Sequence, residues 1–351
     1  MSSVPHKLAS SHLLIIRFSS FGDILQACAV PRGFAAAYAG AKVDWLMRSD
    51  FASLLSHDPG VDRLIPFPRS AGFGGLLRIA WLLGGEAHTH VYDAHANLRS
   101  QVVCWVIRLR RTLRSVFFRR SPARPRFLRR PKERVKRWLL FSLGIRLFPA
   151  PFRGAESFLA PLKPWGVGGT LPPGPHVFPG REPDSELDAF GPFVALAPSA
   201  AWEMKRWPPE HWHRLITLLP DLKFVLLGGP EDGFCEDVRR TAPERVVNLA
   251  GRRSLQGSLQ AVARASLTIA GDTGLLHAAD MMGRPTIALI GPTAFGYPSG
   301  PRSEVMEIEL PCKPCSKDGR GRCRNSIYRR CLVDVEPERV ALAVRRLLGQ
   351  S

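Results

Sequence analysis

The sequence predicts an α/β protein built from two doubly wound halves, each with a parallel sheet. Short apolar runs typical of buried strands alternate with helical patterns along most of the 351 residues. A stretch rich in proline and glycine, 161–192, has no regular period and separates two such alternating regions. Residues 266–293 show the pattern most clearly, because a strand, a Gly-Asp-Thr-Gly turn, a helix and a second strand form one β-α-β unit.

In the first half we expect four strands and three helical regions. The helical regions are a pattern that begins after Asp23, a glycine-flanked helix, and a helix that enters an arginine-rich stretch. The expected strands are 12–17, 42–47, 62–66 and 89–93, and the later helices are 73–83 and a segment from about 97. Gly22 and Asp23 therefore lie on a strand-to-helix turn, at the carboxyl end of a strand, where open α/β sheets bind ligands.

The second half repeats the alternation. The expected strands are 193–197, 223–227, 246–249, 267–270 and 286–290, and the expected helices are 208–218, a segment from about 231, 255–265 and 337–348. The last helix is amphipathic, with its apolar residues on one side. We therefore divide the chain into an N-terminal domain 1–165, a linker 166–192, a C-terminal domain 193–335, and a final helical segment 336–351 that could cross to the N-terminal domain.

Composition favours an ordinary globular protein of the cytoplasm. Hydrophobic residues make up 45% of the chain and charged residues 23%. No run of 18 or more apolar residues appears, so a membrane-spanning helix is not expected. The first residues lack the charged start, longer apolar centre and small-residue cleavage site of a signal peptide.

The formal net charge of +19 calls for an anionic partner. Residues 108–137 contain fourteen arginines and lysines and a single acid, Glu133. A cluster of this density is typical of proteins that meet nucleic acid, an anionic membrane surface, or a substrate rich in phosphates and carboxylates. For any one of these arginines, a solvated surface position is the simpler interpretation.

The Gly-Asp-Thr-Gly turn has the chemistry of a ligand site. Gly271 and Gly274 allow close approach of the backbone, and the free N–H groups of the helix that Thr273 and Gly274 open favour a phosphate. Asp272 and His277 add a carboxylate and an imidazole. The residues alone fit equally well with an Asp that caps the helix, followed by a core histidine.

Several stretches, taken in order, resemble the bacterial ADP-heptose lipopolysaccharide heptosyltransferases of glycosyltransferase family 9. They are RFSSFGDILQACAVP, VYDAHANLRS, LAPSAAWEMKRWPPEHW, LLGGPED, GDTGLLHAADMMGRPTIALIGPT and CKPC…C…CLVDVEPERV. Lys-Arg-Trp-Pro combined with GDTGLLHAA at this distance is the specific part. The resemblance implies the GT-B architecture, in which two Rossmann-like domains face a cleft, with the acceptor in the N-terminal domain and the nucleotide sugar in the C-terminal one. It also implies an inverting transfer without a catalytic metal ion.

The resemblance assigns roles to individual residues. Asp23 matches the family's proposed base, which takes the proton of the acceptor hydroxyl; the alternative is a helix cap. Lys205 matches the lysine that neutralises the leaving diphosphate, with Ser199 on the preceding loop expected to hydrogen-bond a phosphate. The N–H groups of Thr273 and Gly274 would complete the phosphate site.

Further residues are expected around the donor and the acceptor. Asp272 matches the family's acid near the donor sugar hydroxyls, and His277 either contributes or only supports the turn. Glu231 or Asp232 is placed to bind the ribose, and the sequence does not choose between them. Arg17, Arg120 and Arg124 are the expected ligands of an anionic acceptor, such as a lipid A core with its phosphates and Kdo carboxylates.

Seven cysteines fall into two groups. Cys28, Cys104 and Cys235 have apolar surroundings and are predicted to lie in the core. Four close thiols in a cytosolic protein suggest a tetrahedral structural site for zinc, ahead of iron. These are Cys312, Cys315, Cys323 and Cys331. Their spacing is not that of a paired CxxC ribbon, so a site with metal and a site without metal both remain open.

The resemblance implies an enzyme that moves heptose from ADP-heptose to a Kdo or heptose residue of the lipopolysaccharide inner core. It would need no catalytic cofactor and would work in the cytoplasm, peripheral to the inner membrane. One alternative is a relative that uses another nucleotide sugar or a protein acceptor. A remote alternative is a nucleic-acid-binding protein, which would leave the Gly-Asp-Thr-Gly turn unexplained.

Overall fold

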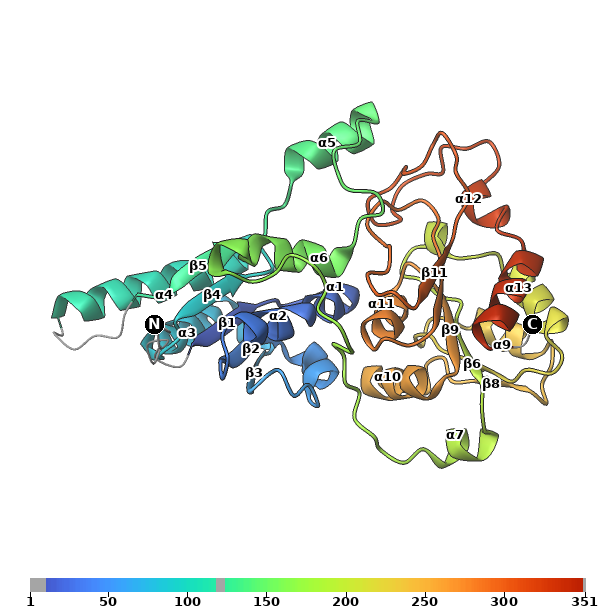
Figure 1. Ribbon diagram of the computed structural model, residues 1–351, viewed down its shortest axis with the longest axis horizontal. Helices are drawn as coiled ribbons and strands as arrows, with labels where there is room; N and C mark the ends of the chain where they lie inside the picture. The colour runs from blue at the N-terminus through green and yellow to red at the C-terminus, as the bar shows by residue number, and fades with distance from the viewer. Residues whose placement is uncertain (1–10, 118–123, 350–351) are drawn as a thin grey trace, which may run out of the picture. The chain divides into compact units, whose positions relative to one another are not determined.

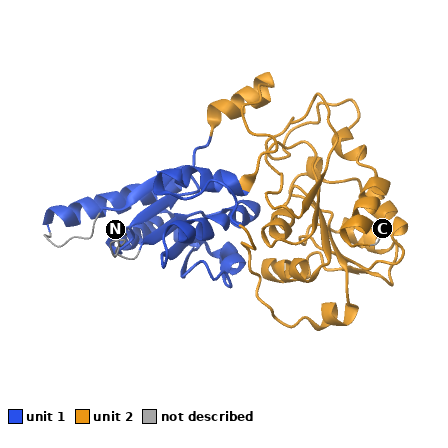
Figure 2. Ribbon diagram, in the orientation of Figure 1, with its two compact units in different colours: residues 1–132, 155–172 blue, residues 133–154, 173–351 orange. Residues whose placement is uncertain are grey.

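The computed structural model describes residues 11–117 and 124–349 (Figure 1). The chain divides into two compact units, which Figure 2 colours separately. The first unit comprises 1–132 and 155–172, and the second comprises 133–154 and 173–351. Each unit has its own parallel sheet, so the predicted α/β class with two Rossmann-like domains is confirmed.

The first unit is built on a five-stranded parallel sheet in the order β3-β2-β1-β4-β5. The strands are β1 (His12–Ile16), β2 (Lys42–Arg48), β3 (Arg63–Phe67), β4 (His90–Asp93) and β5 (Arg126–Arg129). β1 lies in the middle, and its residues from Leu13 to Ile16 are fully buried, which explains the uninterrupted apolar run. The strand order reverses between β1 and β4, so the loops after these two strands flank the topological switch point.

Helices cover both faces of this sheet. They are α1 (Phe21–Ala27), α2 (Ala29–Ala37), η1 (Ser49–Leu55), η2 (Arg69–Ala71), α3 (Gly72–Gly85), α4 (Leu98–Phe117), α6 (Gly154–Leu159) and η3 (Ala160–Trp165). The segment 155–172 returns to this unit and is tied to it by two tyrosines. Tyr92 donates a 2.8 Å hydrogen bond to the carbonyl of Phe158, and Tyr38 donates one of 2.8 Å to the carbonyl of Trp165.

The second unit has a six-stranded parallel sheet in the order β11-β10-β9-β6-β7-β8. The strands are β6 (Val194–Ala197), β7 (Phe224–Leu226), β8 (Val246–Asn248), β9 (Leu267–Gly271), β10 (Thr286–Leu289) and β11 (Ser303–Met306). Here the order reverses between β6 and β9. Ala197 is paired with Ala270, so these two strands end in register and the loops that follow them begin side by side.

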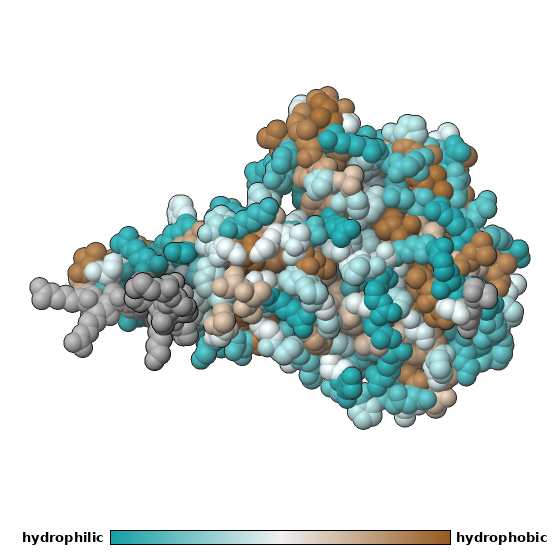
Figure 3. Space-filling view, in the orientation of Figure 1, coloured by the Kyte–Doolittle hydropathy of each residue, from teal (hydrophilic) through white to brown (hydrophobic). Residues whose placement is uncertain are grey.

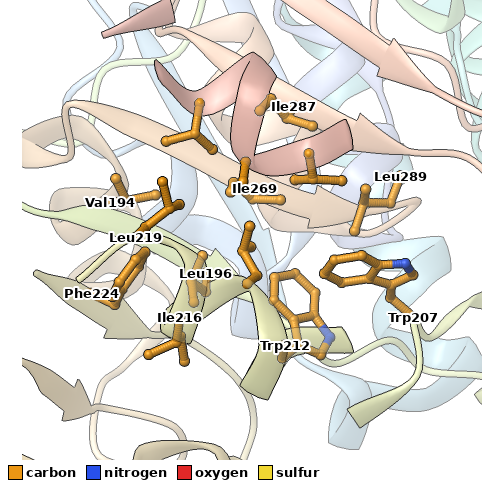
Figure 4. Close-up of a cluster of buried hydrophobic side chains, with 14 of the residues drawn as sticks. Val194, Leu196, Trp207, Trp212, Ile216, Leu219, Phe224, Ile269, Ile287 and Leu289 are labelled. Atoms are coloured by element: carbon orange, nitrogen blue, oxygen red, sulfur yellow. The ribbon is translucent and has the colours of Figure 1, made fainter. Parts of the chain in front are cut away.

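The core of the second unit combines strands with two tryptophans (Figure 4). The helices of the second unit are α5 (Arg134–Leu143), α7 (Ser185–Phe190), η4 (Glu203–Lys205), α8 (Pro209–Leu218), α9 (Phe234–Arg239), α10 (Leu255–Arg264), α11 (Gly274–Met281), α12 (Arg330–Val333) and α13 (Pro337–Leu347). Trp207 and Trp212 meet edge to face, with ring centroids 4.9 Å apart. Val340 and Val344 of α13 are buried in the same core, so the C-terminal helix packs within this unit. From the sequence alone, a crossing of this helix to the first unit was also possible.

The division differs from the sequence-based domains at 133–154, which we had placed in the N-terminal domain. This segment belongs to the second unit because three of its phenylalanines surround Phe295. The ring centroids of Phe141, Phe148 and Phe152 lie 6.1, 5.0 and 4.9 Å from that of Phe295. The alternation of strands and helices along the chain does not predict that 133–154 passes to the second unit before the chain returns to the first.

Two strands were not expected, β5 and β11, because charged residues interrupt their short apolar patterns. No helix among residues 11–117 and 124–349 combines the length and the apolar character needed to cross a membrane.

Candidate active site

Asp23 lies where the chain leaves β1, in the first turn of α1. Ser20 occupies the N-cap position, so the interpretation of Asp23 as the helix cap is wrong. The Ser20 hydroxyl donates a 2.8 Å hydrogen bond to Oδ2 of Asp23, and Nη2 of Arg17 lies 2.5 Å from the same oxygen. The Asp23 side chain is 39% exposed, so this oriented carboxylate remains accessible.

Arg17 is buried and holds the loops after β1 and β4 together. Its Nη1 donates a 2.8 Å hydrogen bond to the carbonyl of Ala94, and its guanidinium lies over the ring of Phe158. Although burial opposes ionisation of Asp23, the charges of Arg17 and Arg130 and the hydrogen bond from Ser20 hold its pKa below the usual value. Asp23 is therefore ionised at neutral pH.

His95, in the loop after β4, was missed by the sequence analysis. Its ring meets Phe18 edge to face at 5.5 Å. Burial, together with the positive charge of Arg17, lowers the pKa of His95 to about 4, while the charge of Asp23 acts in the opposite direction. A neutral imidazole thus accompanies the Asp23 carboxylate at the switch point of the first unit. The sequence contained one indication that His95 belongs to this site: it lies in VYDAHANLRS, just after a buried strand.

In the second unit, Lys205 and Asp272 come from the two loops that flank the switch point. Nζ of Lys205 donates a 2.6 Å hydrogen bond to the carbonyl of Asp272 and lies 3.4 Å from its Oδ2. Gly271 allows this approach, because a Cβ at that position would lie 2.9 Å from the carbonyl oxygen of Lys205. The two residues expected at the donor phosphate and the donor sugar are therefore adjacent.

The carboxylate of Asp272 has three positive or donating neighbours. Thr293 donates a 2.8 Å hydrogen bond to Oδ2, and Nε2 of His277 lies 3.7 Å from Oδ1. Burial raises the pKa of Asp272, but His277, Lys205 and Thr293 together lower it far below the usual value. Asp272 is therefore firmly ionised, and its partners are side chains and not the N–H groups of α11.

The amino end of α11 begins at Gly274 with Thr273 at the N-cap position, so the interpretation of Asp272 as the cap is wrong. The Thr273 side chain makes no capping hydrogen bond, and its buried hydroxyl oxygen has no protein partner. His277 is also buried, with Nδ1 unbonded. Free N–H groups of a helix and a buried unpaired hydroxyl are suited to an anionic ligand.

Ser199 and Asp232 also meet, at the carboxyl ends of β6 and β7. The Ser199 hydroxyl donates a 2.5 Å hydrogen bond to Oδ1 of Asp232, whose Oδ2 accepts one of 2.7 Å from the N–H of Gly229. Nη2 of Arg206 lies 3.5 Å from Oδ1. Asp232 is buried in this turn, whereas Glu231 is exposed. Of the two acids, Glu231 has the carboxylate accessible to a ligand.

Known proteins resemble this chain in sequence. Residues 180–324 match the sequence profile of glycosyltransferase family 9 (heptosyltransferase). Lipopolysaccharide heptosyltransferase 1 of Escherichia coli K12 is 27% identical over 327 residues, which cover 85% of this chain and 93% of the relative. Lipooligosaccharide heptosyltransferase 2 of Haemophilus influenzae is 29% identical over 167 residues, which cover 45% of this chain and 48% of the relative. The chain is therefore similar to the heptosyltransferases of glycosyltransferase family 9, most clearly in its second half.

A solved structure extends the likeness to the whole fold. The ADP-heptose lipopolysaccharide heptosyltransferase II of E. coli superposes with a TM-score of 0.68 at 21% identity, covering 97% of this chain and 99% of that one. The protein therefore has the GT-B type of fold.

The basic cluster of this enzyme is not a single surface. Arg129 donates a 3.0 Å hydrogen bond to buried Asp93, and Arg130 donates one of 2.6 Å to the hydroxyl of Ser157. Arg111 is buried. Of the expected acceptor ligands, Arg124 is exposed and Arg120 lies outside the described residues. The expectation that the whole cluster faces one polyanion is thus wrong, because several members hold the first unit together.

The cysteines of the glycosyltransferase are placed partly as predicted. Cys28, Cys104 and Cys235 are buried, which confirms them as core residues. Burial, with the nearby thiols of Cys312 and Cys323, raises the pKa of Cys315. Among the described residues, however, only one group brings three metal-ligating atoms within 4.8 Å of one another, and it contains no cysteine. A tetrahedral zinc site would hold its sulfurs about 3.8 Å apart, so the present arrangement is more open than a closed site.

That one group is His12, Asp44 and His88, at the amino ends of the strands of the first unit. Nε2 of His88 and Nε2 of His12 lie 2.9 and 3.1 Å from Oδ2 of Asp44. Nη2 of Arg63 lies 2.5 Å from the same oxygen. The guanidinium occupies the place that a cation would take, so we interpret the group as a buried polar network that joins the strands.

Proposed function

We propose that the enzyme transfers heptose from ADP-heptose to an anionic inner-core acceptor of lipopolysaccharide, a Kdo or a heptose residue, with inversion and without a catalytic metal ion. The observation that carries this proposal is the meeting of Lys205 and Asp272 beside the free amino end of α11. A cation, a carboxylate and helix N–H groups at one switch point suit a nucleoside diphosphate sugar. The names of the E. coli relatives support heptose, ADP and lipopolysaccharide as the specific groups.

On the donor side, the diphosphate would lie at the amino end of α11. The N–H groups there and the Thr273 hydroxyl would donate hydrogen bonds to its oxygens. Lys205 would neutralise the charge that develops on the diphosphate as the bond to the sugar breaks, which is the part a metal ion plays in other enzymes. Asp272 would accept hydrogen bonds from the sugar hydroxyls, and exposed Glu231 would bind the ribose.

On the acceptor side, Asp23 would act as the base. The acceptor oxygen attacks the anomeric carbon as its proton passes to the Asp23 carboxylate, and the bond from that carbon to the diphosphate breaks, so ADP leaves. Attack opposite to the leaving group inverts the anomeric centre. Arg17 orients Asp23 and keeps it ionised, and acceptor binding by Arg17, Arg120 and Arg124 stays part of the proposal.

The four clustered cysteines are proposed as a structural zinc or iron site, for which the sulfurs would have to draw together. Metal analysis of the purified enzyme tests this, with Cys323→Ser as the comparison. Near-stoichiometric zinc or iron that is lost in the variant would support it, and metal-free active enzyme would exclude it. The enzyme itself is proposed to work in the cytoplasm, peripheral to the inner membrane.

The first experiment is to measure the melting temperature with ADP, ADP-heptose, UDP-sugars, GDP-sugars and a short DNA duplex. A ligand that binds only the folded protein must raise it. We expect a rise with the ADP compounds alone, kept in Asp23→Ala and diminished in Lys205→Ala. A rise with UDP or GDP compounds would support a relative that uses another nucleotide sugar. A rise with DNA alone would overturn the proposal.

The second experiment is the transfer assay itself, with ADP-heptose and a Kdo–lipid A acceptor. Product formation without added divalent metal, and still in the presence of a chelator, is the expected result. Donor binding without transfer to this acceptor, but with transfer to a protein, would overturn the proposed acceptor and keep the donor.

A further inference from the structure

The outer sides of α3 and α4 in the first unit carry a row of exposed apolar side chains. On α4, Trp105, Val116 and Phe117 are 72, 71 and 73% exposed, and Leu109 is 55% exposed. Positions 105, 109 and 116 share one side of a helix, so these side chains form a stripe that faces away from the core. In the view of Figure 3, hydrophobic surface adjoins hydrophilic surface over the last turns of α4.

The stripe continues onto α3. This helix exposes Phe73, Leu77 and Trp81, which are four residues apart and therefore on one side of the helix. α3 and α4 pack against one another. Trp81 lines one surface depression together with Leu113 and Phe117 of α4. The two rows therefore meet, and we call them together the α3–α4 face: Phe73, Leu77, Trp81, Trp105, Leu109, Leu113, Val116 and Phe117.

Arginines join the two helices beside this face. The guanidinium of Arg110 lies 5.1 Å from the ring centroid of Trp81 and donates to the Trp81 carbonyl. Nη1 of Arg114 donates a 2.9 Å hydrogen bond to the carbonyl of Gly85. These contacts keep Trp81 at the surface and place positive charge at the edge of an apolar patch.

The charge of the two helices has one sign. α3 and α4 contain six arginines and no aspartate or glutamate. The six are Arg78, Arg99, Arg108, Arg110, Arg111 and Arg114. Arg111 is 3% exposed and none of its three guanidinium nitrogens has a protein partner. Burial, with the charges of Arg114 and Arg110, lowers its pKa. The charge of Glu86, just after α3, acts in the opposite direction.

We propose that the α3–α4 face docks on an anionic lipid bilayer, with its apolar side chains at the acyl boundary and its arginines at the headgroup phosphates. A helix surface with tryptophan, phenylalanine and leucine bordered by arginines has the composition of interfacial membrane helices. A second copy of the chain is a poorer occupant, because two such faces, each bordered by exposed arginines of helices that contain no acid, would repel each other. The inference deepens the proposed function, since the proposed acceptor is a membrane lipid.

The test is flotation of the full-length enzyme with vesicles of phosphatidylcholine alone and of phosphatidylcholine mixed with phosphatidylglycerol. We expect binding to the mixed vesicles only, weakened by salt. The triple variant Trp105→Ser, Leu109→Ser, Val116→Ser should lower the partition coefficient by more than about tenfold. All three positions are exposed, so its melting temperature should stay near that of the wild type.

Two matched controls lie in the second unit. Leu342→Ser changes an apolar residue that is 73% exposed on α13, and Arg181→Glu is the counterpart of Arg99→Glu on α4. The controls should bind vesicles as the wild type does, whereas Arg99→Glu should bind more weakly.

Equal binding by the triple variant and by Leu342→Ser would overturn the inference, as would a wild type that ignores anionic vesicles. A wild-type dimer that the triple substitution turns into a monomer would assign the face to self-association and also overturn it. Transfer to a water-soluble acceptor analogue separates the two proposals. Transfer without vesicle binding would overturn only the membrane-docking inference. Vesicle binding without any transfer would overturn only the proposed function.

Discussion

At the scale of single residues, Asp23 is held in place by Arg17 and Ser20 but keeps an accessible carboxylate. Asn has the same shape and no basic oxygen. Asp23→Asn should therefore lower the transfer rate by about a hundredfold or more, while the rise in melting temperature with ADP is unchanged. Steady-state transfer and thermal unfolding measure the two effects. A variant with nearly full activity would leave Asp23 with only a role in the turn.

Lys205 allows a similar test on the donor side. Its ammonium lies 3.4 Å from Oδ2 of Asp272, the residue before the N-cap of α11. Removal of a group that stabilises the leaving diphosphate should lower kcat by about a hundredfold or more. Lys205→Ala should show this loss, and Lys317→Ala, which changes an exposed lysine of the same unit, should not. Comparable losses in both variants would argue against a specific role.

The pH dependence of the rate follows from two groups of the first unit. The pKa of Asp23 lies below its usual value and that of His95 is about 4. Both groups therefore stay unprotonated as the pH falls, and they should cause no loss of kcat/KM between about pH 8 and about pH 5. A pH–rate profile with His95→Gln as the comparison tests this. An inflection near the ordinary histidine pKa that disappears in the variant would contradict it.

At the scale of elements, His90 joins β4 to α2 and η3. Its ring centroid lies 5.2, 5.0 and 4.8 Å from those of Phe34, Tyr38 and Trp165. Burial, with the charge of Arg126, lowers the pKa of His90 from 6.5 to about 4. The unfolded chain thus binds the proton more readily, so the full stability is present above the unfolded pKa and is lost as the pH falls towards the folded one.

This contribution of His90 can be measured by urea unfolding at neutral pH and at a pH between its folded and unfolded pKa values. The loss due to His90 amounts to at most about 3 kcal/mol. His90→Gln, which cannot titrate, should show a smaller loss of unfolding free energy over the same range. Equal losses in both proteins would mean that other groups cause the acid sensitivity.

The elements also show where the sequence was sufficient. The strands with continuous apolar runs, such as Leu13 to Ile16, were predicted nearly to the residue because burial on both faces leaves a local pattern. β5 was missed because its ends are charged. Asp23, Lys205 and Asp272 were predicted as site residues from turns and from the resemblance, and this stays a prediction. His95 was missed because its chemistry depends on β4 lying beside β1, a pairing between segments far apart in the sequence.

At the scale of the whole molecule, each unit has its own switch point, and ligand effects should be divided accordingly. ADP should slow hydrogen exchange in the loops after β6 and β9, residues 198–205 and 271–275, because the proposed phosphate ligands lie there. The loops after β1 and β4 should be unaffected. Exchange mass spectrometry with ADP, and with UDP as the control, measures this. Protection confined to the first unit would contradict the assignment of the donor to the second.

The path of the chain between the units has a consequence for synthesis on the ribosome. The chain leaves the first unit after residue 132, returns at 155, and leaves again after 172. Phe148 and Phe152 are made before the residues that complete the first unit, yet their partner Phe295 follows much later. During synthesis, these aromatic rings therefore have no Phe295 to pack against while the first unit, which includes Trp165, completes its folding. For the same reason, a hybrid that takes one unit from a relative must be joined at three places along the chain.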